Sequence, residues 1–430
     1  MKQLLEQLYP LHRTLNHDDN DKALEYIGSY IQNEAFNIHD YIPGENIFDW
    51  SVPKRFYVKK AQLKDMNGQV IVDIRNNPLH IVSYSSSFEG KIHFNELKDH
   101  LYFDKESIND IPWIYKYYDD SWGLCLSYND YLLLDENGIY EVDIETEFKD
   151  EPMRIGELYL PGKFKQEIVV VTDICHPYQV NDSISGVVIA AKIAKALKDV
   201  SLNNSVRFLF VPETIGTVAW FSTEKEQIKR TLFAMSFDCL GNTNSLKFQQ
   251  TLYADTLLDQ IGRNVAGKME CSIARFREYM SNDESMLSSP GLEIPTIAFT
   301  RAPFDEYHTS ADTPENIHWE SMNRSYEVIY KVLLTSLLDY YPKQKIQGFL
   351  FLKKHGLWER AFSNQKYYVK ELFQLLNAKH TVFELCEILN LDFMNIYELL
   401  ESCYADGLID KEPITRNCSS YPKLRKINFT

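Results

Sequence analysis

The order of apolar and polar positions divides the chain into stretches of different texture. Residues 1–40 place apolar side chains at spacings of three and four, which predicts helices. From Phe48 to about Thr146 the pattern changes to short runs of two-fold alternation, as expected of a mostly β module. Asn-Gly pairs at 67–68 and 137–138 interrupt these runs and predict turns. The predicted strands of this module include 69–74 and 131–134.

From about residue 155, short apolar runs alternate with helical segments. Strands that are buried on both faces have this composition, and their alternation with helices predicts a largely parallel sheet. The predicted strands are Glu167–Asp173, Val206–Val211, Phe233–Phe237 and Pro295–Phe299, and the predicted helices are Ser185–Lys198 and Ser325–Tyr341.

A smaller unit begins after Pro342-Lys343-Gln344. Three short helices followed by an extended hairpin are the outline of a winged helix-turn-helix, which we expect over residues 345–430. Thr381 and Asp392 are suitable N-caps for its second and third helices. The predicted helices are Lys366–Leu376, Val382–Leu389 and Phe393–Tyr404, and the extended segment begins at Gly407-Leu408-Ile409.

The charges of this unit argue against DNA binding. Residues 345–430 carry twelve Lys and Arg against ten Asp and Glu. The helix in the recognition position, Phe393–Tyr404, contains Glu398 and Glu401 and no Lys or Arg. Because base readout and phosphate contact both need donors there, we interpret the unit as a module for protein interaction or homo-oligomer formation.

The composition is that of a soluble globular protein with two to four domains in 430 residues. The formal net charge of −16 argues against broad nucleic-acid or anionic-membrane binding. Seven cysteines without a C-x-x-C pair predict neither a disulfide framework nor a zinc finger, and so a reducing compartment. The N-terminus reaches a charge too soon for a signal peptide, and no apolar stretch has the length of a membrane span. We therefore expect a cytoplasmic protein with no membrane partner.

Titratable residues gather where the predicted strands end. In open α/β sheets the carboxyl edge of the strands is where ligands bind, so we expect these side chains to lie together. Asp173 ends the first strand, His176 follows it, Asp182 precedes the helix at 185–198, Glu213 and Asp238 follow the next two strands, and His308 lies in the loop after 295–299.

Two histidines and several carboxylates at one edge have the composition of a zinc site. Catalytic zinc keeps a position for water, and a carboxylate beside it that is not a ligand can act as general base. Each residue has a simpler explanation alone: His176 as a loop histidine, Asp182 as a charge favoured at a helix N-terminus, Asp238 as a strand cap. Glu213 is harder to explain, because an acid directly after a buried strand is costly unless paired. Together they favour a metal site.

Aromatic residues are unusually dense in the β module, with five in ten residues. Most such clusters pack in a core or against a sheet edge, and a minority line a substrate cleft. The cluster consists of Trp113, Tyr115, Tyr117, Tyr118 and Trp122.

Four motifs occur in an order that is similar to the zinc aminopeptidases of the leucyl-aminopeptidase and glutaminyl-cyclase type. They are Asn181-Asp182-Ser183-Ile184-Ser185-Gly186, Glu213-Thr214-Ile215-Gly216, Asp238-Cys239-Leu240-Gly241 and Tyr307-His308-Thr309-Ser310-Ala311-Asp312-Thr313. More closely, nearly the whole chain resembles bacterial aminopeptidase-like proteins that are often labelled as domains of unknown function. Those proteins carry a β insertion, a C-terminal winged helix and names that link them to polysaccharide biosynthesis. The segments 48–53, 79–85, 122–125 and 175–177 match that family.

The resemblance implies a role for each site residue. It makes His176, Asp182 and Asp238 ligands of one metal, with Asp182 as the bridging carboxylate. It makes His308 the histidine of a neighbouring site and Glu213 the general base. Further residues that it places behind the ligands or against the substrate are Asp173, Asp283, Glu284, Tyr307 and Asp312.

The chain departs from the pattern of the dizinc peptidases in three places. They have two consecutive glutamates where this chain has Glu213-Thr214, so a carboxylate ligand of the second site is lost. The related family commonly has a histidine where Asp173 stands, which leaves open whether Asp173 or His176 is the first ligand. Ser285 and Met286 replace the end of an Asp-Glu-Arg-Gln motif and with it a substrate-anchoring arginine. We expect one firmly held Zn²⁺ ion.

The resemblance implies a three-layer α/β aminopeptidase-like fold (phosphorylase/hydrolase-like) with a mostly parallel sheet. It is assembled from residues 1–45 and 150–342, with a β-rich insertion at 46–149 and the winged helix at 345–430. The implied function is zinc-dependent hydrolysis of an amide or peptide bond in a small peptide, an aminoacyl conjugate or an N-acyl sugar. The alternatives are a metal-containing binding or scaffold protein and, least favoured, a regulator that binds DNA.

Overall fold

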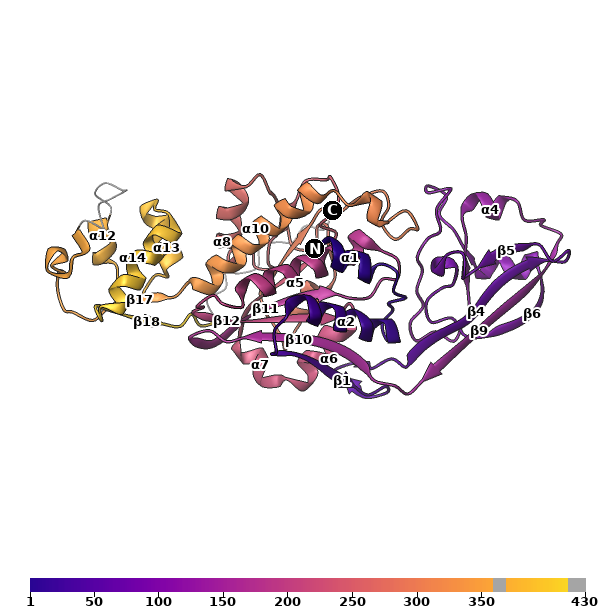
Figure 1. The fold of residues 1–430 in the computed structure, drawn as a ribbon, viewed down its shortest axis with the longest axis horizontal. Helices are drawn as coiled ribbons and strands as arrows, with labels where there is room; N and C mark the ends of the chain where they lie inside the picture. Colours follow the sequence, from indigo (N-terminus) through magenta and orange to yellow (C-terminus); the bar gives the residue numbers. More distant parts are fainter. Residues whose placement is uncertain (359–368, 417–430) are drawn as a thin grey trace.

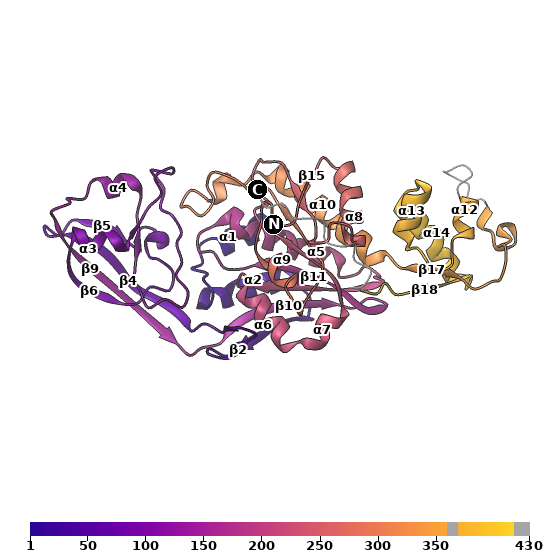
Figure 2. The same cartoon turned by 180° about the vertical axis from the view of Figure 1, so that it is seen from behind.

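The computed structural model describes residues 1–358 and 369–416. Figure 1 shows an elongated molecule, with a β-rich part at one end, a central sheet covered by helices, and a small helical part at the other end. Seen from behind in Figure 2, the three parts follow one another along the long axis. Among the described residues, no helix is both long and apolar enough to cross a membrane.

The central sheet has eight strands in the order β1-β10-β12-β11-β13-β16-β14-β15. The four central neighbours β12, β11, β13 and β16 are parallel, whereas β10 and β14 run antiparallel to β12 and β16. This confirms the predicted α/β fold with its largely parallel sheet. The strands are β1 (Phe36–Tyr41), β10 (Met153–Leu160), β11 (Phe164–Asp173), β12 (Asn204–Val211), β13 (Thr231–Phe237), β14 (Lys247–Gln249), β15 (Ser272–Ala274) and β16 (Thr296–Thr300).

Helices cover both faces of this sheet. Successive side chains of β11 point to opposite faces: Val170 packs into the core under one set of helices and Val169 into the core under the other. The first set is α1 (Lys2–Leu8), α2 (Asp18–Ile31), α5 (Gly186–Leu197), α8 (Leu257–Lys268) and α10 (Trp319–Leu338). The second set is α6 (Ile215–Thr223), α7 (Lys225–Arg230) and α9 (Asp283–Leu287).

The insertion is built on an antiparallel sheet in the order β5-β4-β9-β6. Its apolar side chains share one continuous core with the second face of the central sheet. Gly68 lies in the turn between β4 and β5 with φ +85°, a conformation that favours glycine, as the Asn-Gly pair predicts. The elements are β4 (Arg55–Asp65), β5 (Val70–Asp73), β6 (Phe88–His93), α3 (Phe94–Leu97), β7 (Leu101–Tyr102), β8 (Leu124–Cys125), α4 (Tyr128–Leu132) and β9 (Ile139–Lys149), after a short hairpin of β2 (Asn46–Ile47) and β3 (Trp50–Ser51).

Two predictions of local structure are wrong. The run 131–134 was expected to be a strand, but its first half ends α4, whose N-cap Ser127 accepts a hydrogen bond from the backbone of Asp130. Leu133 is 83% exposed, so this run lacks the buried face that a strand of its composition needs. Residues 36–40 were expected to be helical, but they lie in β1, the edge strand paired with β10.

The C-terminal part contains the predicted helices, including α13 with the predicted bounds and a capping box at Thr381. Residues 366–368 of the first predicted helix lie outside the described residues. The strand after the helices pairs with the strand that precedes them, and the winged helix stays a prediction. The elements are β17 (Tyr341–Gln344), α12 (Val369–Gln374), α13 (Val382–Leu389), α14 (Phe393–Ala405) and β18 (Ile409–Glu412).

Candidate metal centre

The four parallel strands end at one edge of the sheet, and each is followed by a candidate residue. β11 ends at Asp173, and His176 lies three residues further along the same loop. Glu213 follows β12, Asp238 follows β13, and His308 lies in the loop after β16. Parallel pairing is what brings side chains from distant parts of the sequence to this edge.

Asp182 reaches the same edge through an irregular turn, Val180–Ser185, that leads into α5. The close approach of this turn to β13 depends on Gly186, because a Cβ atom at that position would lie 2.3 Å from the backbone oxygen of Phe237. Only glycine fits there. The contact carries Asp182 to the end of β13, beside Asp238.

Asp182 lies at the centre of the candidate ligands. Its Oδ2 atom is 2.7 Å from Nε2 of His308, and its Oδ1 atom is 3.9 Å from Nε2 of His176. His176, Asp182 and His308 each offer a ligand atom within 4.8 Å of the other two, and so do Asp182, Asp238 and Cys239. The structure thus brings the four predicted ligands together in one connected cluster.

The buried atoms of this cluster fit a cation. Asp182 Oδ2 and His308 Nε2 are close, yet neither has a hydrogen-bond partner with acceptable geometry. Burial alone would raise the pKa of Asp182, but the imidazoles of His176 and His308 hold it well below its ordinary value, so the group is a carboxylate. A carboxylate oxygen and an imidazole nitrogen that converge without sharing a hydrogen bond are the donors that zinc takes.

Glu213 lies beside this cluster and is open to solvent. Its Oε2 atom is 3.3 Å from Nε2 of His176, and its side chain is 25% exposed. The backbone N–H of Glu213 donates a hydrogen bond to Sγ of Cys175 at 3.1 Å, and that sulfur lies 3.4 Å from Nδ1 of His176. The buried thiol therefore connects the ring of a candidate ligand to the backbone of the candidate base.

Asp312 holds the turn that carries Asp182. Its carboxyl group accepts hydrogen bonds from the backbone N–H groups of Val180, Asn181 and Asp182 and from the side-chain amide of Asn181, at 2.9–3.2 Å. Burial raises the pKa of Asp312 to about 7, although these hydrogen bonds act in the opposite direction. Asp312 therefore lies behind the candidate ligands and holds one of them in place, in agreement with the role that the resemblance implies.

Asp173 and Asp283 form a second acidic group, deeper than the first. Burial, followed by the nearby charges of Asp283 and Glu213, raises the pKa of Asp173 well above its ordinary value. Asp283 accepts a hydrogen bond from the backbone of Thr214 at 3.5 Å. Among the described residues, the groups that could hold a metal include His176 and not Asp173. The geometry therefore favours His176 as the first ligand.

Among the described residues, Glu284 belongs to none of the groups that could hold a metal. Its carboxylate accepts hydrogen bonds from the backbone N–H of Asn282 at 3.0 and 3.2 Å, at the start of α9. Burial raises its pKa to about 7. Glu284 is thus explained by local structure and not by contact with the cluster.

Aromatic rings flank the two histidines. Tyr307 stacks on His308 with 3.8 Å between ring centroids and is 48% exposed. Trp113 of the insertion is buried, and its ring lies 4.3 Å from that of His176 and 4.7 Å from that of His308. Its backbone N–H donates to the carbonyl oxygen of His308 at 2.7 Å. Trp113, a member of the aromatic cluster found in the sequence, therefore lies at the site.

Sequence reasoning gave no role to Arg13, Cys175 or Trp113 individually. Trp113 could be found only as one of five clustered aromatic residues, and Cys175 only as the neighbour of His176. Arg13 carries no motif at all, although its guanidinium group contacts the loop before His176.

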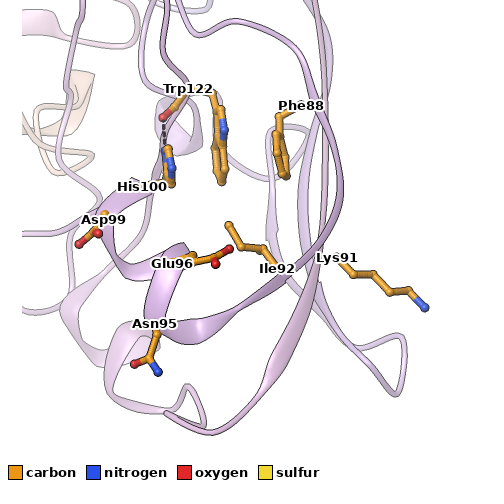
Figure 3. A pocket seen from close by; sticks show the side chains of 8 residues that line it. All are labelled: Phe88, Lys91, Ile92, Asn95, Glu96, Asp99, His100 and Trp122. Carbon is orange, nitrogen blue, oxygen red and sulfur yellow. Dashed lines mark hydrogen bonds between the residues drawn. The ribbon is translucent and has the colours of Figure 1, made fainter.

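The insertion also has a surface cavity of about 480 Å³, shown in Figure 3. The rings of His100, Trp122 and Phe88 stack along its wall, with centroid distances of 3.8 and 4.5 Å. None of the residues that line it belongs to the candidate metal cluster, so we treat it as separate from the site.

Solved structures with the same fold include a zinc aminopeptidase and other peptidases. A zinc aminopeptidase from Bacillus subtilis superposes with a TM-score of 0.61, at 12% identity, over 78% of this chain and 94% of that chain. The precursor of an M28 peptidase from Shewanella amazonensis gives a TM-score of 0.57 at 13% identity, over 78% of this chain and 92% of that chain. At these identities the likeness defines the fold, which is that of aminopeptidase-like proteins.

The sequence comparison defines the family. Residues 2–338 match the model of the domain of unknown function DUF4910, and the chain belongs to that family. A Clostridium acetobutylicum protein named for polysaccharide biosynthesis and an aminopeptidase-like domain is 30% identical, over 94% of this chain and 95% of its own length. A crystal structure from the same species, titled as a peptidase, superposes with a TM-score of 0.83 at 28% identity, over 95% of both chains. The family resemblance predicted from the sequence is confirmed, and the relatives and structural neighbours are peptidase-like hydrolases.

Proposed function

We propose that this protein is a zinc-dependent hydrolase of amide or peptide bonds. The observation that carries the proposal is the cluster around Asp182, with two histidines at its carboxylate oxygens and the partly exposed Glu213 carboxylate beside it. The fold of zinc aminopeptidases and a relative named for an aminopeptidase-like domain support the same class.

We propose one ligand set for the metal. His176, Asp182 and Asp238 would hold one Zn²⁺, and His308 would approach from the other side of Asp182. The second ion of a dizinc site would lack a carboxylate, because Thr214 stands where a second glutamate would be. When bound, zinc supplies a Lewis acid for the carbonyl oxygen and lowers the pKa of water toward neutrality.

The residues of the chain would move the protons. Glu213 accepts a proton from the attacking water and returns it to the nitrogen of the leaving amine. The hydrogen bonds to Cys175 and Asp283 fix the backbone of residues 213–214, and so the position of this carboxylate. The buried ring of Trp113 keeps water from the inner side of His176 and His308.

The proposed substrate is a small peptide, an aminoacyl conjugate or an N-acyl sugar, and the proposed location is the cytoplasm. The name of the Clostridium acetobutylicum relative, with its reference to polysaccharide biosynthesis, is the reason to keep sugars in this set. We further propose the domain limits 1–45 with 150–342, 46–149 and 345–430, and a protein-interaction or homo-oligomer role for the winged helix.

A second function has one observation in its favour. Thr214 removes a metal ligand that dizinc peptidases have, and a site weakened in this way would suit a metal-containing binding or scaffold protein. The two functions differ in turnover, so the same experiment separates them.

The experiment combines metal analysis with a substrate panel. We expect close to one zinc per chain and hydrolysis of at least one aminopeptidase, dipeptide or N-acyl-sugar substrate. Glu213→Gln should keep its zinc and lose about 10²–10⁴-fold in kcat, because proton transfer is lost while the shape of the side chain is kept. Glu226→Gln, an exposed change in α7, is the matched control and should behave as wild type.

Three results would contradict these proposals. A zinc-loaded wild type that hydrolyses nothing in the panel would favour the scaffold. Loss of zinc from Glu213→Gln would make Glu213 a ligand instead of a base. Full zinc retention by His308→Ala would remove His308 from the metal site.

A further inference from the structure

Arg13 is a fully buried cation beneath the candidate metal site. It lies between α1 and α2 and is 1% exposed. Its Nη1 atom donates hydrogen bonds to the carbonyl oxygens of Ile174 at 2.7 Å and Cys175 at 2.9 Å, and its Nη2 atom donates to that of His176 at 2.7 Å. All three acceptors belong to the loop that carries the first candidate ligand.

The partners of Arg13 are unusual for a buried arginine. Burying a charge is costly unless the charge is paired, and arginine in a protein interior normally meets carboxylates. Arg55 donates to Asp21 at 2.9 Å and Arg207 to Glu167 at 2.8 Å, as expected. The hydrogen bonds of Arg13 go instead to neutral backbone carbonyls. Burial lowers the pKa of Arg13 to about 10, so the group remains a cation at neutral pH.

The loop that Arg13 binds has a backbone that needs support. His176 has φ +73° and Tyr178 has φ +55°, and non-glycine residues in this left-handed region cost free energy unless their surroundings hold them. The three carbonyl groups point inward, where a buried acceptor without a partner is also costly. A planar guanidinium group with several fixed donors satisfies all three at once, which a single ammonium group on a flexible chain does not reproduce.

We propose that Arg13 is a positioning residue for the metal site: it fixes the backbone of residues 174–176 so that the His176 imidazole faces Asp182 and the metal. This inference rests on the proposed function, because it takes His176 to be a zinc ligand. Arg13 acts through the loop and touches neither substrate nor metal.

The test compares Arg13→Lys with Arg55→Lys in the full-length chain. Both changes remove a buried guanidinium fork and keep the positive charge, so both should lower the melting temperature. Zinc affinity, measured by competition with a chromogenic chelator, should fall about 10–100-fold in Arg13→Lys, as when a support of a metal ligand is lost. It should stay at the wild-type value in Arg55→Lys. In Arg13→Ala, added methylguanidinium should restore part of the lost affinity.

Wild-type zinc affinity in Arg13→Lys, or an equal loss in Arg55→Lys, would overturn the inference. A readout without metal separates this result from failure of the proposed function. In zinc-free protein with ¹⁵N-labelled histidine, the ring signals of His176 should move in Arg13→Lys while those of the distant His380 stay in place. Unmoved His176 signals would refute the positioning role even if wild type binds no zinc.

Discussion

Replacing Asp312 by asparagine tests how the turn that carries Asp182 is held. The Asp312 carboxyl group accepts four hydrogen bonds, two at each oxygen. Asparagine keeps one oxygen, so its amide NH₂ group would face two donors that lose their acceptor. Each buried N–H left without a partner costs about 1–3 kcal/mol, so the lost hydrogen bonds lower the unfolding free energy by about 2–6 kcal/mol. At neutral pH the variant also removes the charge whose burial raises the pKa of Asp312 from 3.8 to about 7, which returns up to about 4 kcal/mol. Because the turn carries Asp182, zinc affinity should fall about 10–100-fold as well.

The assay is urea unfolding of the zinc-free chain, followed by chelator competition for zinc. Asp305→Asn is the matched control, because it makes the same chemical change at an exposed position of the same loop and should cost less than about 0.5 kcal/mol. A gain of more than about 2 kcal/mol in the unfolding free energy of Asp312→Asn at neutral pH would refute the hydrogen-bond argument, because the relief of the buried charge would then be unopposed. A large loss of stability with unchanged zinc affinity would refute the link from Asp312 to Asp182.

Three further predictions follow from other parts of the chain. Burial raises the pKa of Asp339 from 3.8 to about 7, so between these pH values the folded state keeps a proton that the unfolded state releases. The contribution of the protonated Asp339 to stability is full below about pH 4 and is lost as the pH rises to 7. Asp339→Asn should therefore be more stable than wild type at pH 8, by up to about 4 kcal/mol, and this gain should disappear at pH 4. An equal gain at both pH values would contradict the argument. Gly186→Ala should cost at least about 1–3 kcal/mol in urea unfolding, since its Cβ would meet the Phe237 carbonyl oxygen, whereas Gly267→Ala, with open space around it, should not. Fluorescence anisotropy should find no sequence-dependent duplex binding near physiological salt, because helix α14 offers glutamates and no basic side chain; sub-micromolar specific affinity would overturn this.

The main sheet could be predicted because its strands are buried on both faces. The run that became β11 contains four fully buried residues, Ile168, Val169, Val170 and Val171. Such a composition is typical of a strand that is buried on both faces. Once the strands were placed, the rule that ligands bind at their carboxyl ends pointed to the candidate residues without knowledge of any contact. The metal roles were added by resemblance, and they stay a proposal.

The errors arose where burial does not follow from local composition. Leu132 and Leu133 have the apolar character of a strand, yet they lie on the surface of the insertion. The strand β1 was missed because its alternation is weak: Ile38 is 41% exposed, and the strand exists through its pairing with β10, more than a hundred residues away. Tertiary pairing decided the case of β1, and a local pattern does not contain it.

Arg13 and Trp113 could not be assigned for a related reason. Arg13 is more than 160 residues from the loop that it binds, and Arg13 itself belongs to no motif. Trp113 reaches His308 only because the insertion folds back onto the central part. A sequence indicates a metal ligand through its residue type. A residue that holds a ligand in place can be any hydrogen-bond donor that the fold brings near it.

Trp113 and Asp312 both act through the loop that carries His308, and this arrangement bears on the role of the insertion. Residues 111–113 of the insertion form backbone hydrogen bonds with residues 308–310, on both sides of the bridge between Pro112 and Thr309. The same loop supplies His308 and, four residues later, Asp312, which holds the turn of Asp182. A shift of the insertion would therefore move a candidate ligand and the support of another together. The insertion is for this reason a structural part of the candidate metal site and not an appended module.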